Sequence, residues 1–235
     1  MRAMILAAGR GERMRPLTDT CPKPLLTVGG TPLIIWHIRR LARSGIRDII
    51  INHAWLGDQI EAALGDGQSH GVRLTYSPEP TALETAGGIA QALEFFRGEP
   101  FLVINGDIWC DWDPAQAPTI ADGLHTRQDL AWLLLVDNPG HHPNGDFRLR
   151  PDARLGLVDG PALTFSGIGI YRPELFSAVI PGTPAKLAPI LRSVIANDRA
   201  CATHHVGRWV DVGTPERLRG LDEWLAQQGA SGAAP

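Results

Sequence analysis

The stretch that decides the fold is Leu6-Ala7-Ala8-Gly9-Arg10-Gly11-Glu12-Arg13-Met14-Arg15-Pro16-Leu17-Thr18, followed shortly by Pro22-Lys23-Pro24-Leu25. The apolar run just before it, at residues 3–6, is typical of a first buried strand. The small residues Ala7, Ala8 and Gly9 allow the backbone to approach a ligand, and Gly9 and Gly11 permit dihedrals that other residues resist. Successive N–H groups in such a loop form an anion-binding concavity.

Positive charge is concentrated beside this loop. Arg13 and Lys23 provide cations for phosphate oxygens, whereas Arg10 and Arg15 are better explained as solvated loop residues. The loop lacks the third glycine of the dinucleotide-binding fingerprint and the lysine of the Walker motif, so neither motif matches. The loop therefore indicates a site for a nucleoside triphosphate.

The quoted residues resemble the signature of the sugar-nucleotide pyrophosphorylases, the nucleotidyltransferases that act on sugar 1-phosphates. The resemblance implies two catalytic cations: Arg13 would hold the leaving pyrophosphate, and Lys23 the α-phosphate as negative charge builds on it. The nucleotide-binding residues that it implies in this loop are Leu6, Ala7, Ala8, Gly9, Gly11, Arg13 and Lys23.

The composition is that of a globular protein. The chain has 235 residues and a formal net charge of −3, with 44% hydrophobic and 20% charged residues. This predicts a single domain at 1–228, with a nucleotide-binding half at about 1–110, a sugar-binding half at about 111–228 and a disordered tail at 229–235. The near-neutral charge argues against nucleic-acid binding, and no apolar run approaches the length of a membrane span.

Cysteine usage and the start of the chain bear on the compartment. Cys21, Cys110 and Cys201 are widely separated and odd in number, which is typical of free thiols in a reducing compartment. Met1 and Arg2 lead directly into the first strand, which is unlike a signal or transit peptide. We therefore expect a cytoplasmic protein, and we expect it to be a monomer.

Strand-like and helix-like segments alternate along the first half of the chain. This pattern predicts an α/β fold with a Rossmann-like, doubly wound, mostly parallel mixed sheet and right-handed crossovers, which the resemblance narrows to the nucleotide-diphospho-sugar transferase fold. Further strands in the second half predict a smaller subdomain over the open edge of the sheet. The expected strands lie at 3–6, 46–51, 71–76, 100–107, 130–136, 147–149, 156–158, 163–171 and 201–206, and the expected helices at 31–44, 57–64, 90–96, 186–195 and from 215 onward.

Two carboxylates are candidate metal ligands. Asp107 ends an apolar strand, and Asp211 lies in Trp209-Val210-Asp211-Val212-Gly213-Thr214. Mg²⁺ typically binds one or two carboxylates together with phosphate oxygens and water. In the sugar nucleotidyltransferases the two matching positions hold the catalytic Mg²⁺, so the resemblance implies this role for Asp107 and Asp211.

A second small-residue loop, expected at 83–89, is the candidate base-binding segment. Relatives carry Gln or Glu at the position of Glu79, where the side chain contacts a pyrimidine ring. A carboxylate there can accept the N3–H of uracil, and backbone N–H groups near Gly87 and Gly88 can donate to the carbonyls of the ring. Uracil and thymine differ by one methyl group, worth only about 1–3 kcal/mol in an apolar pocket.

The sugar-binding half departs from the pattern of many sugar nucleotidyltransferases, because it lacks both their Glu-Lys-Pro motif and their Asn-x-Gly motif. Instead, segments 51–57, 137–142, 145–149 and 186–189 resemble the N-acetylmuramate 1-phosphate uridylyltransferases of bacterial cell-wall recycling. This implies UTP and N-acetylmuramic acid 1-phosphate as substrates. A mannose-1-phosphate guanylyltransferase and a glucose-1-phosphate thymidylyl- or uridylyltransferase remain alternatives. A non-catalytic homologue is disfavoured, because Arg13, Lys23, Asp107 and Asp211 are all present.

Lys186 is a candidate to replace the missing lysine of Glu-Lys-Pro at the sugar phosphate. The other residues assigned to the sugar phosphate are Asn105, Asn138 and Gly145. His53 is interpreted as a hydrogen-bonded turn histidine. His141 and His142 are interpreted as residues of an exposed turn, since adjacent histidines point in different directions and no third ligand is evident.

Overall fold

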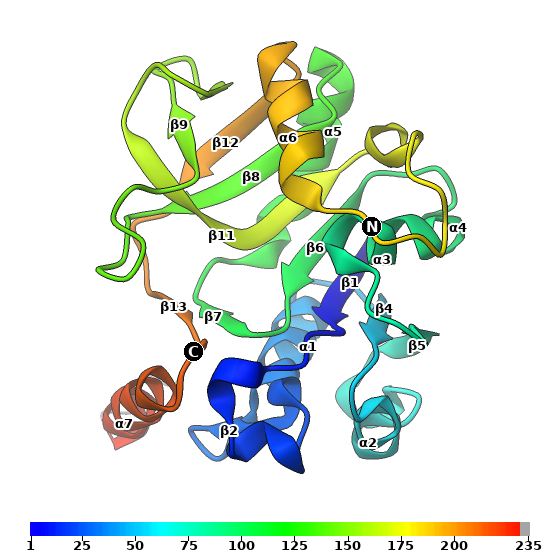
Figure 1. Ribbon diagram of the computed structural model, residues 1–235, viewed down its shortest axis with the longest axis vertical. Coiled ribbons are helices and arrows are strands. Elements are labelled where there is room, and N and C mark those ends of the chain that lie inside the picture. Colours follow the sequence, from blue (N-terminus) through cyan, green and yellow to red (C-terminus); the bar gives the residue numbers. More distant parts are fainter. Residues whose placement is uncertain (231–235) are drawn as a thin grey trace.

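The first half of the chain builds a parallel sheet (Figure 1). The computed structural model describes residues 1–230, and residues 231–235 of the expected tail lie outside the described part. Four strands lie side by side in the spatial order β6 (Phe101–Asn105), β1 (Arg2–Ala7), β4 (Asp48–His53) and β5 (Arg73–Pro78). The chain moves outward from β1 to β5 and then returns to β6 on the other side of β1. At such a reversal of strand order, a crevice for ligands forms beyond the carboxyl ends of the strands.

Helices cover both faces of this sheet. Successive residues of each strand point to opposite faces, so apolar strand residues pack against helices on each side. Ala3 and Ile5 pack with Ile38 on one face, whereas Met4 packs with Ile89 on the other. The central residues of β1, β4 and β6 are buried and apolar, as expected for parallel strands covered on both sides. The helices that follow these strands are α1 (Leu33–Arg43), α2 (Gly57–Leu64), α3 (Glu84–Gln91) and α4 (Leu93–Phe96).

The second half of the chain extends the same sheet. The long strand β11 (Ala162–Tyr171) pairs antiparallel with β6, with Ile168 opposite Ile104. Within residues 1–230 the complete sheet has nine strands. The expected subdomain is therefore continuous with the open edge of the parallel sheet. Its other elements are α5 (Ala117–Arg127), β8 (Ala131–Val136), β9 (Phe147–Leu149), β10 (Leu155–Gly156), α6 (Leu187–Ala196) and β12 (Ala200–His204).

After β12 the chain returns to the first half of the molecule. Strand β13 (Trp209–Asp211) pairs antiparallel with β7 (Ile108–Cys110), which directly follows Asp107. The last helix, α7 (Pro215–Ala230), lies far from α6 in Figure 1. The Oγ1 of Thr214 accepts a hydrogen bond of 3.4 Å from the N–H of Arg217 and so caps the start of this helix. This return brings Asp211 next to the chain around Asp107.

Helix α5 and strands β7 and β13 were not expected, and most element boundaries shift by a few residues from the expected ones. Three of the differences have a clear cause. The segment expected as a loop at 83–89 is mostly helical, because α3 begins at Glu84 and the carbonyl of Ala185 accepts hydrogen bonds from its first turn. Helix α1 begins only at Leu33, since β3 (Thr31–Pro32) pairs with β2 (Thr27–Val28). Helix α7 extends to Ala230, two residues into the expected tail, because lengthening an existing helix costs little. Among the described residues, no helix is long and apolar enough to cross a membrane.

Candidate active site

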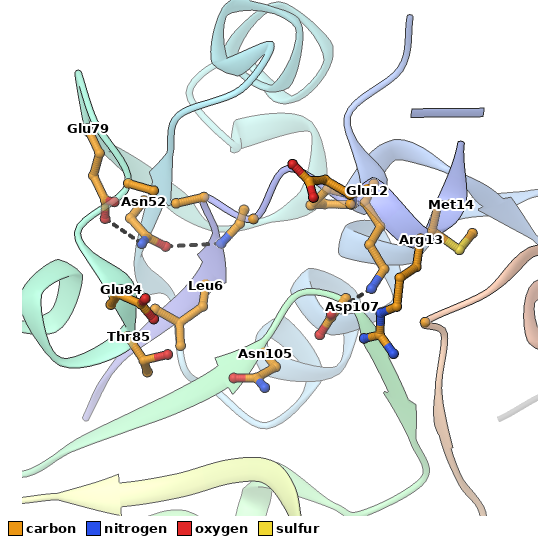
Figure 2. Close-up of a pocket in the computed structure, with 18 residues that line it drawn as sticks. Leu6, Glu12, Arg13, Met14, Asn52, Glu79, Glu84, Thr85, Asn105 and Asp107 are labelled. Atoms are coloured by element: carbon orange, nitrogen blue, oxygen red, sulfur yellow. Dashed lines mark hydrogen bonds and ion pairs between the residues drawn. The ribbon is translucent and has the colours of Figure 1, made fainter. Parts of the chain in front are cut away.

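A pocket of about 560 Å³ lies beyond the carboxyl ends of β1, β4 and β6. In Figure 2, Asn52 and Glu79 lie on one side of it, and Arg13 and Asp107 lie on the other. The structure brings most of the predicted nucleotide-binding residues to this pocket. Those that line it are Leu6, Ala7, Ala8, Gly9, Gly11, Arg13, Lys23, Glu79 and Asp107, together with Asn105, which was assigned to the sugar phosphate.

Hydrogen bonds to a backbone carbonyl of the glycine-rich loop fix the conformation of the loop. The carbonyl of Gly11 accepts a bond of 2.8 Å from Thr18 Oγ1 and another of 2.8 Å from the N–H of Met14. Gly11 adopts a φ of +65°, and a Cβ there would lie 2.9 Å from the Thr18 Cγ2. Gly9 is different, because a Cβ there would meet nothing within 4 Å. The loop shape therefore depends on Gly11.

The Gly11→Ala variant should lose about 2 kcal/mol of unfolding free energy, because the new side chain is strained by the left-handed backbone and by contact with Thr18. Urea denaturation checks this. Gly9→Ala is the matched control and should change the unfolding free energy by less than about 0.5 kcal/mol. Equal losses in the two variants would contradict this account of the loop.

Two cations face the pocket in different ways. Lys23 is only 7% exposed, and its Nζ lies 2.6 Å from Asp107 Oδ2. Arg13 is exposed beside Asp107 and makes no hydrogen bond or ion pair with another described residue. The guanidinium of Arg10 instead lies over the Trp55 ring, and Arg15 forms a surface ion pair with Asp19. The charge available to a polyanion is therefore that of Arg13 and Lys23.

A buried chain of hydrogen bonds forms the opposite wall (Figure 2). The N–H of Ala7 donates to Asn52 Oδ1 at 3.0 Å, and Asn52 Nδ2 donates to Glu79 Oε1 at 2.7 Å. Glu79 Oε2 accepts from the N–H of Leu83 at 2.8 Å, and the Glu79 side chain is almost fully buried. Asn52 and Glu79 thus connect Ala7, at the start of the glycine-rich loop, to the segment before α3. Sequence reasoning missed Asn52 as a site residue, although its place at the end of a buried strand was a usable indication.

Gly87 and Gly88 lie within α3 and do not line the pocket. The N–H of Gly87 already donates to the carbonyl of Ala185 at 3.2 Å. A Cβ on Gly88 would lie 2.5 Å from Glu79 Oε1, so this glycine allows the Asn52–Glu79 pair to pack against the helix. The pocket residues contributed by this segment are instead Ala82, Glu84 and Thr85.

Asp107 and Asp211 stand on neighbouring segments, since the N–H of Val212 donates to the carbonyl of Asp107 at 3.0 Å. Each carboxylate is paired through its Oδ2, Asp107 with Lys23 and Asp211 with Arg217. The Oδ1 atoms of both make no hydrogen bond within residues 1–230. Asp107 lines the pocket, whereas Asp211 does not. A free carboxylate oxygen on each of these neighbouring residues suits Mg²⁺, which prefers hard oxygen ligands.

Another group of metal-ligand side chains lies outside the pocket. Ligand atoms of Cys110, Asp111 and His205 lie within 4.8 Å of one another. Asp111 Oδ1 is 2.7 Å from His205 Nε2, and its Oδ2 accepts from the N–H of Arg208 at 2.9 Å. Burial raises the pKa of the Cys110 thiol to about 12. These contacts explain the group as a hydrogen-bonded cluster that holds the connection between β12 and β13 in place.

A buried histidine supports the strand after Asp107. Burial, and to a smaller extent the nearby Arg40, lowers the pKa of His37 to about 4, although a hydrogen bond to the Ile108 backbone acts in the opposite direction. His37 is therefore neutral at physiological pH. It lies in the core behind the site and does not line the pocket.

Comparison with known proteins identifies the family. The profile of the family described as "Nucleotidyl transferase" matches residues 2–142. The chain belongs to the nucleotidyl transferase family. It is 57% identical to the N-acetylmuramate alpha-1-phosphate uridylyltransferase of Neisseria meningitidis serogroup B, over 93% of this chain and 96% of that protein. It is 33% identical to the protein of the same name from Caulobacter vibrioides, over 96% of this chain and 97% of that protein.

A structural comparison agrees with this family. A Bacillus anthracis crystal structure described as a glucose-1-phosphate thymidylyltransferase superposes with a TM-score of 0.82 at 24% identity, over 96% of this chain and 95% of that one. This likeness confirms the predicted nucleotide-diphospho-sugar transferase fold. The expected resemblance to sugar-1-phosphate nucleotidyltransferases is confirmed as well, and the protein is a nucleotidyltransferase.

The residues that were assigned to the sugar phosphate do not all lie at the first pocket of this nucleotidyltransferase. Asn138 Oδ1 accepts from Thr164 Oγ1, and its Nδ2 donates to two carbonyl oxygens, so this side chain braces the loop after β8. Gly145 packs against Asn138 in the same loop. Lys186 is exposed at the start of α6 and lines a separate cavity of about 620 Å³. The structure thus brings Asn105 to the first pocket, but not Asn138, Gly145 or Lys186.

The histidines behave largely as interpreted. His53 is buried, and its Nε2 is 2.6 Å from Glu61 Oε1, which confirms a hydrogen-bonded structural role. His142 pairs with Asp146 in the exposed loop after β8. His141 lies in the same loop, but its Nε2 contacts Arg217 and lies 3.4 Å from Asp211 Oδ2. That contact joins segments 70 residues apart, which no local pattern reveals.

Proposed function

We propose that this nucleotidyltransferase transfers UMP from UTP to N-acetylmuramic acid 1-phosphate, giving UDP-N-acetylmuramic acid and pyrophosphate. The observation that carries the substrate assignment is the 57% identity, over nearly the full length of both chains, to a relative named for this reaction. The pocket supports the chemistry, because a glycine-rich loop, a free arginine and a buried lysine meet at one edge of the sheet.

The reaction requires two anions to approach each other. A phosphate oxygen of the sugar 1-phosphate forms a bond to the α-phosphorus of UTP, while the bond from that phosphorus to the bridging oxygen breaks. Pyrophosphate leaves with the electron pair. A phosphate monoester is already a competent nucleophile, so no general base is required. The protein has to position the two anions and offset their repulsion.

The roles of the two cations follow from their surroundings. Arg13 has no partner in the described chain, so its guanidinium is free to hold the leaving pyrophosphate. Lys23 projects from a buried position toward Asp107 and supplies charge at the α-phosphate. Lys23 therefore stabilises charge that builds in the transition state.

Asp107 and Asp211 are the residues that would hold Mg²⁺ in this nucleotidyltransferase. When bound, Mg²⁺ supplies charge neutralisation at the phosphate oxygens. The free Oδ1 atoms of the two carboxylates, on neighbouring segments, support the assignment. Base recognition is assigned to the wall that contains Glu79, with Glu84 and Thr85 lining the same pocket.

We place the reaction in bacterial cell-wall recycling in the cytoplasm. The product would carry the muramic acid of degraded peptidoglycan back to the nucleotide-sugar pool. Free cysteines at positions 21, 110 and 201 support a reducing compartment.

Pyrophosphate release tests the proposal. With Mg²⁺ and UTP, we expect kcat/KM for N-acetylmuramic acid 1-phosphate to exceed that for the 1-phosphates of N-acetylglucosamine, glucose and mannose by at least about 100-fold, as a site built for one polar group achieves. GTP and dTTP are compared with UTP on the same sugar. EDTA should abolish turnover and added Mg²⁺ should restore it. Equal activity with glucose or mannose 1-phosphate would discard this substrate and leave the nucleotidyltransferase assignment intact.

A further inference from the structure

Arg217, near the start of α7, neutralises the Asp211 carboxylate. Its Nη1 donates to Asp211 Oδ2 at 2.7 Å and to His141 Nε2 at 2.6 Å. The Arg217 and Asp211 side chains are 20% and 23% exposed, so the ion pair is shielded but reachable by solvent. An ion pair in such a position is weak enough to exchange partners.

The rest of the guanidinium lies behind a residue of the pocket wall, although Arg217 does not itself line the pocket. A Cβ on Gly213 would overlap Arg217 Nη2, so the guanidinium rests directly on this glycine, which lines the pocket. The N–H groups of Nε and Nη2 make no hydrogen bond with any described residue. Arg217 therefore presents a planar set of unused donors at the edge of the site, the geometry that suits a phosphate.

Each of the two candidate metal-binding carboxylates is paired with a basic side chain. Lys23 is paired with Asp107, and Arg217 is paired with Asp211. A divalent cation that binds these carboxylates, even through their free Oδ1 atoms, weakens both ion pairs, because its charge offsets the negative charge that holds each side chain and repels the side chain itself. A displaced Lys23 stays near the phosphate loop, and a displaced Arg217 stays near Gly213.

The third member of this group comes from the sugar-binding half. His141 lies in the loop between β8 and β9, which belongs to the segment that departs from the common family pattern. Arg217 therefore connects the carboxylate on β13 with the loop of the other half. A ligand held by Arg217 would lie between these two parts of the molecule.

We infer that Arg217 is a phosphate-binding residue for the sugar 1-phosphate, which it can bind once a divalent cation takes over Asp211. This inference rests on the proposed function, because it assigns a residue to the second substrate of that reaction. It also supplies a cation for the sugar phosphate in place of Lys186, which lines a different cavity.

A purely structural role for Arg217 and the proposed exchange predict opposite effects of its removal on metal binding. If Arg217 only anchors Asp211, its loss lets the carboxylate move and weakens metal binding. If Arg217 competes for Asp211, its loss strengthens metal binding in the absence of substrates. The sign of the change therefore separates the two roles.

The test compares Arg217→Gln with Arg219→Gln. Arg219 is exposed on the same helix, and its contact with Glu216 is 3.8 Å long, so it is a matched control. Electron paramagnetic resonance of free Mn²⁺, titrated with nucleotide-free protein, measures metal affinity without turnover. We expect Arg217→Gln to bind Mn²⁺ about two- to fivefold more tightly than the wild type, and Arg219→Gln to match the wild type.

Steady-state kinetics then test whether Arg217 binds the sugar 1-phosphate. Arg217→Gln should raise the KM for the sugar 1-phosphate roughly 10- to 100-fold, the value of a hydrogen-bonded charge, and leave the KM for UTP within about twofold. Arg217→Lys should recover part of the loss, because it retains the charge without the planar donors. Thermal unfolding of each variant checks that it is folded.

Weaker or unchanged Mn²⁺ binding in Arg217→Gln would overturn the exchange, and an unchanged KM for the sugar phosphate would overturn the binding role. Failure of the proposed function looks different, because the wild type would then not turn over N-acetylmuramic acid 1-phosphate. In that case the KM comparison is made on the sugar 1-phosphate that the wild type does use, and the Mn²⁺ titration is unaffected.

Discussion

Replacing Lys23 by methionine should lower kcat about 100- to 1,000-fold, the usual cost of removing one preorganised donor from a charge-stabilising site. The side chain is 7% exposed and its Nζ lies 2.6 Å from Asp107 Oδ2, so its charge is held at the pocket with little solvent screening. Methionine preserves the aliphatic packing and removes only the charge. The loss should therefore appear mainly in turnover.

The measurement is initial-rate pyrophosphate release at saturating substrates, with the unfolding free energy determined in parallel. Arg15→Met is the control, because Arg15 pairs with Asp19 on the surface and does not line the pocket. Its kcat should stay within about twofold of the wild type. A Lys23→Met variant that is folded and retains more than a third of the wild-type kcat would rule out the catalytic role.

Removing the Asn52 side chain should destabilise the protein and weaken UTP binding together. In Asn52→Ala, the buried N–H of Ala7 and the buried carboxylate of Glu79 each lose a partner. Two unsatisfied buried groups predict a loss of about 3 kcal/mol in unfolding free energy. The KM for UTP should rise about tenfold, because a small displacement of the phosphate loop misplaces the reacting groups.

Urea denaturation and UTP titration check the two effects. Gln59→Ala removes an exposed amide from α2 and serves as the control, with an expected change below about 0.5 kcal/mol. A stable Asn52→Ala variant with normal UTP kinetics would show that the hydrogen-bond chain does not position the loop. Loss of stability with an unchanged KM would restrict Asn52 to a structural role.

The parts of the site that sequence reasoning found are those encoded by contiguous residues. The phosphate loop from Leu6 to Lys23 combines an apolar strand, small residues and cations within a short stretch, and the structure gathers its predicted residues at one pocket. The alternation of strands and helices likewise predicted the sheet, because hydrophobic periodicity is a local property. Asp107 was found because it follows a buried strand at the sheet edge where ligands bind.

The parts that sequence reasoning missed depend on contacts between distant segments. Asn52 and Glu79 are 27 residues apart, yet they form one hydrogen-bonded wall. Gly87 lies in the predicted segment, but its N–H is taken by Ala185, almost a hundred residues away. Lys186 was expected to fill the gap left by the missing Glu-Lys-Pro lysine, whereas it lines another cavity at the start of α6.

The sequence alone determined the alternation of strands and helices in the first half, the glycine-rich loop with its neighbouring cations Arg13 and Lys23, and the family, because periodicity and motif spacing are carried by neighbouring residues. Only the tertiary structure decided which polar groups remain free to bind a ligand. Among residues 1–230, Arg13 is without a partner, whereas Glu79 and Asn138 are already hydrogen-bonded, and Arg217 reaches Asp211 and His141 from the start of α7. Such pairings are set by packing between segments far apart in the chain, and a linear pattern does not specify the direction in which a side chain points.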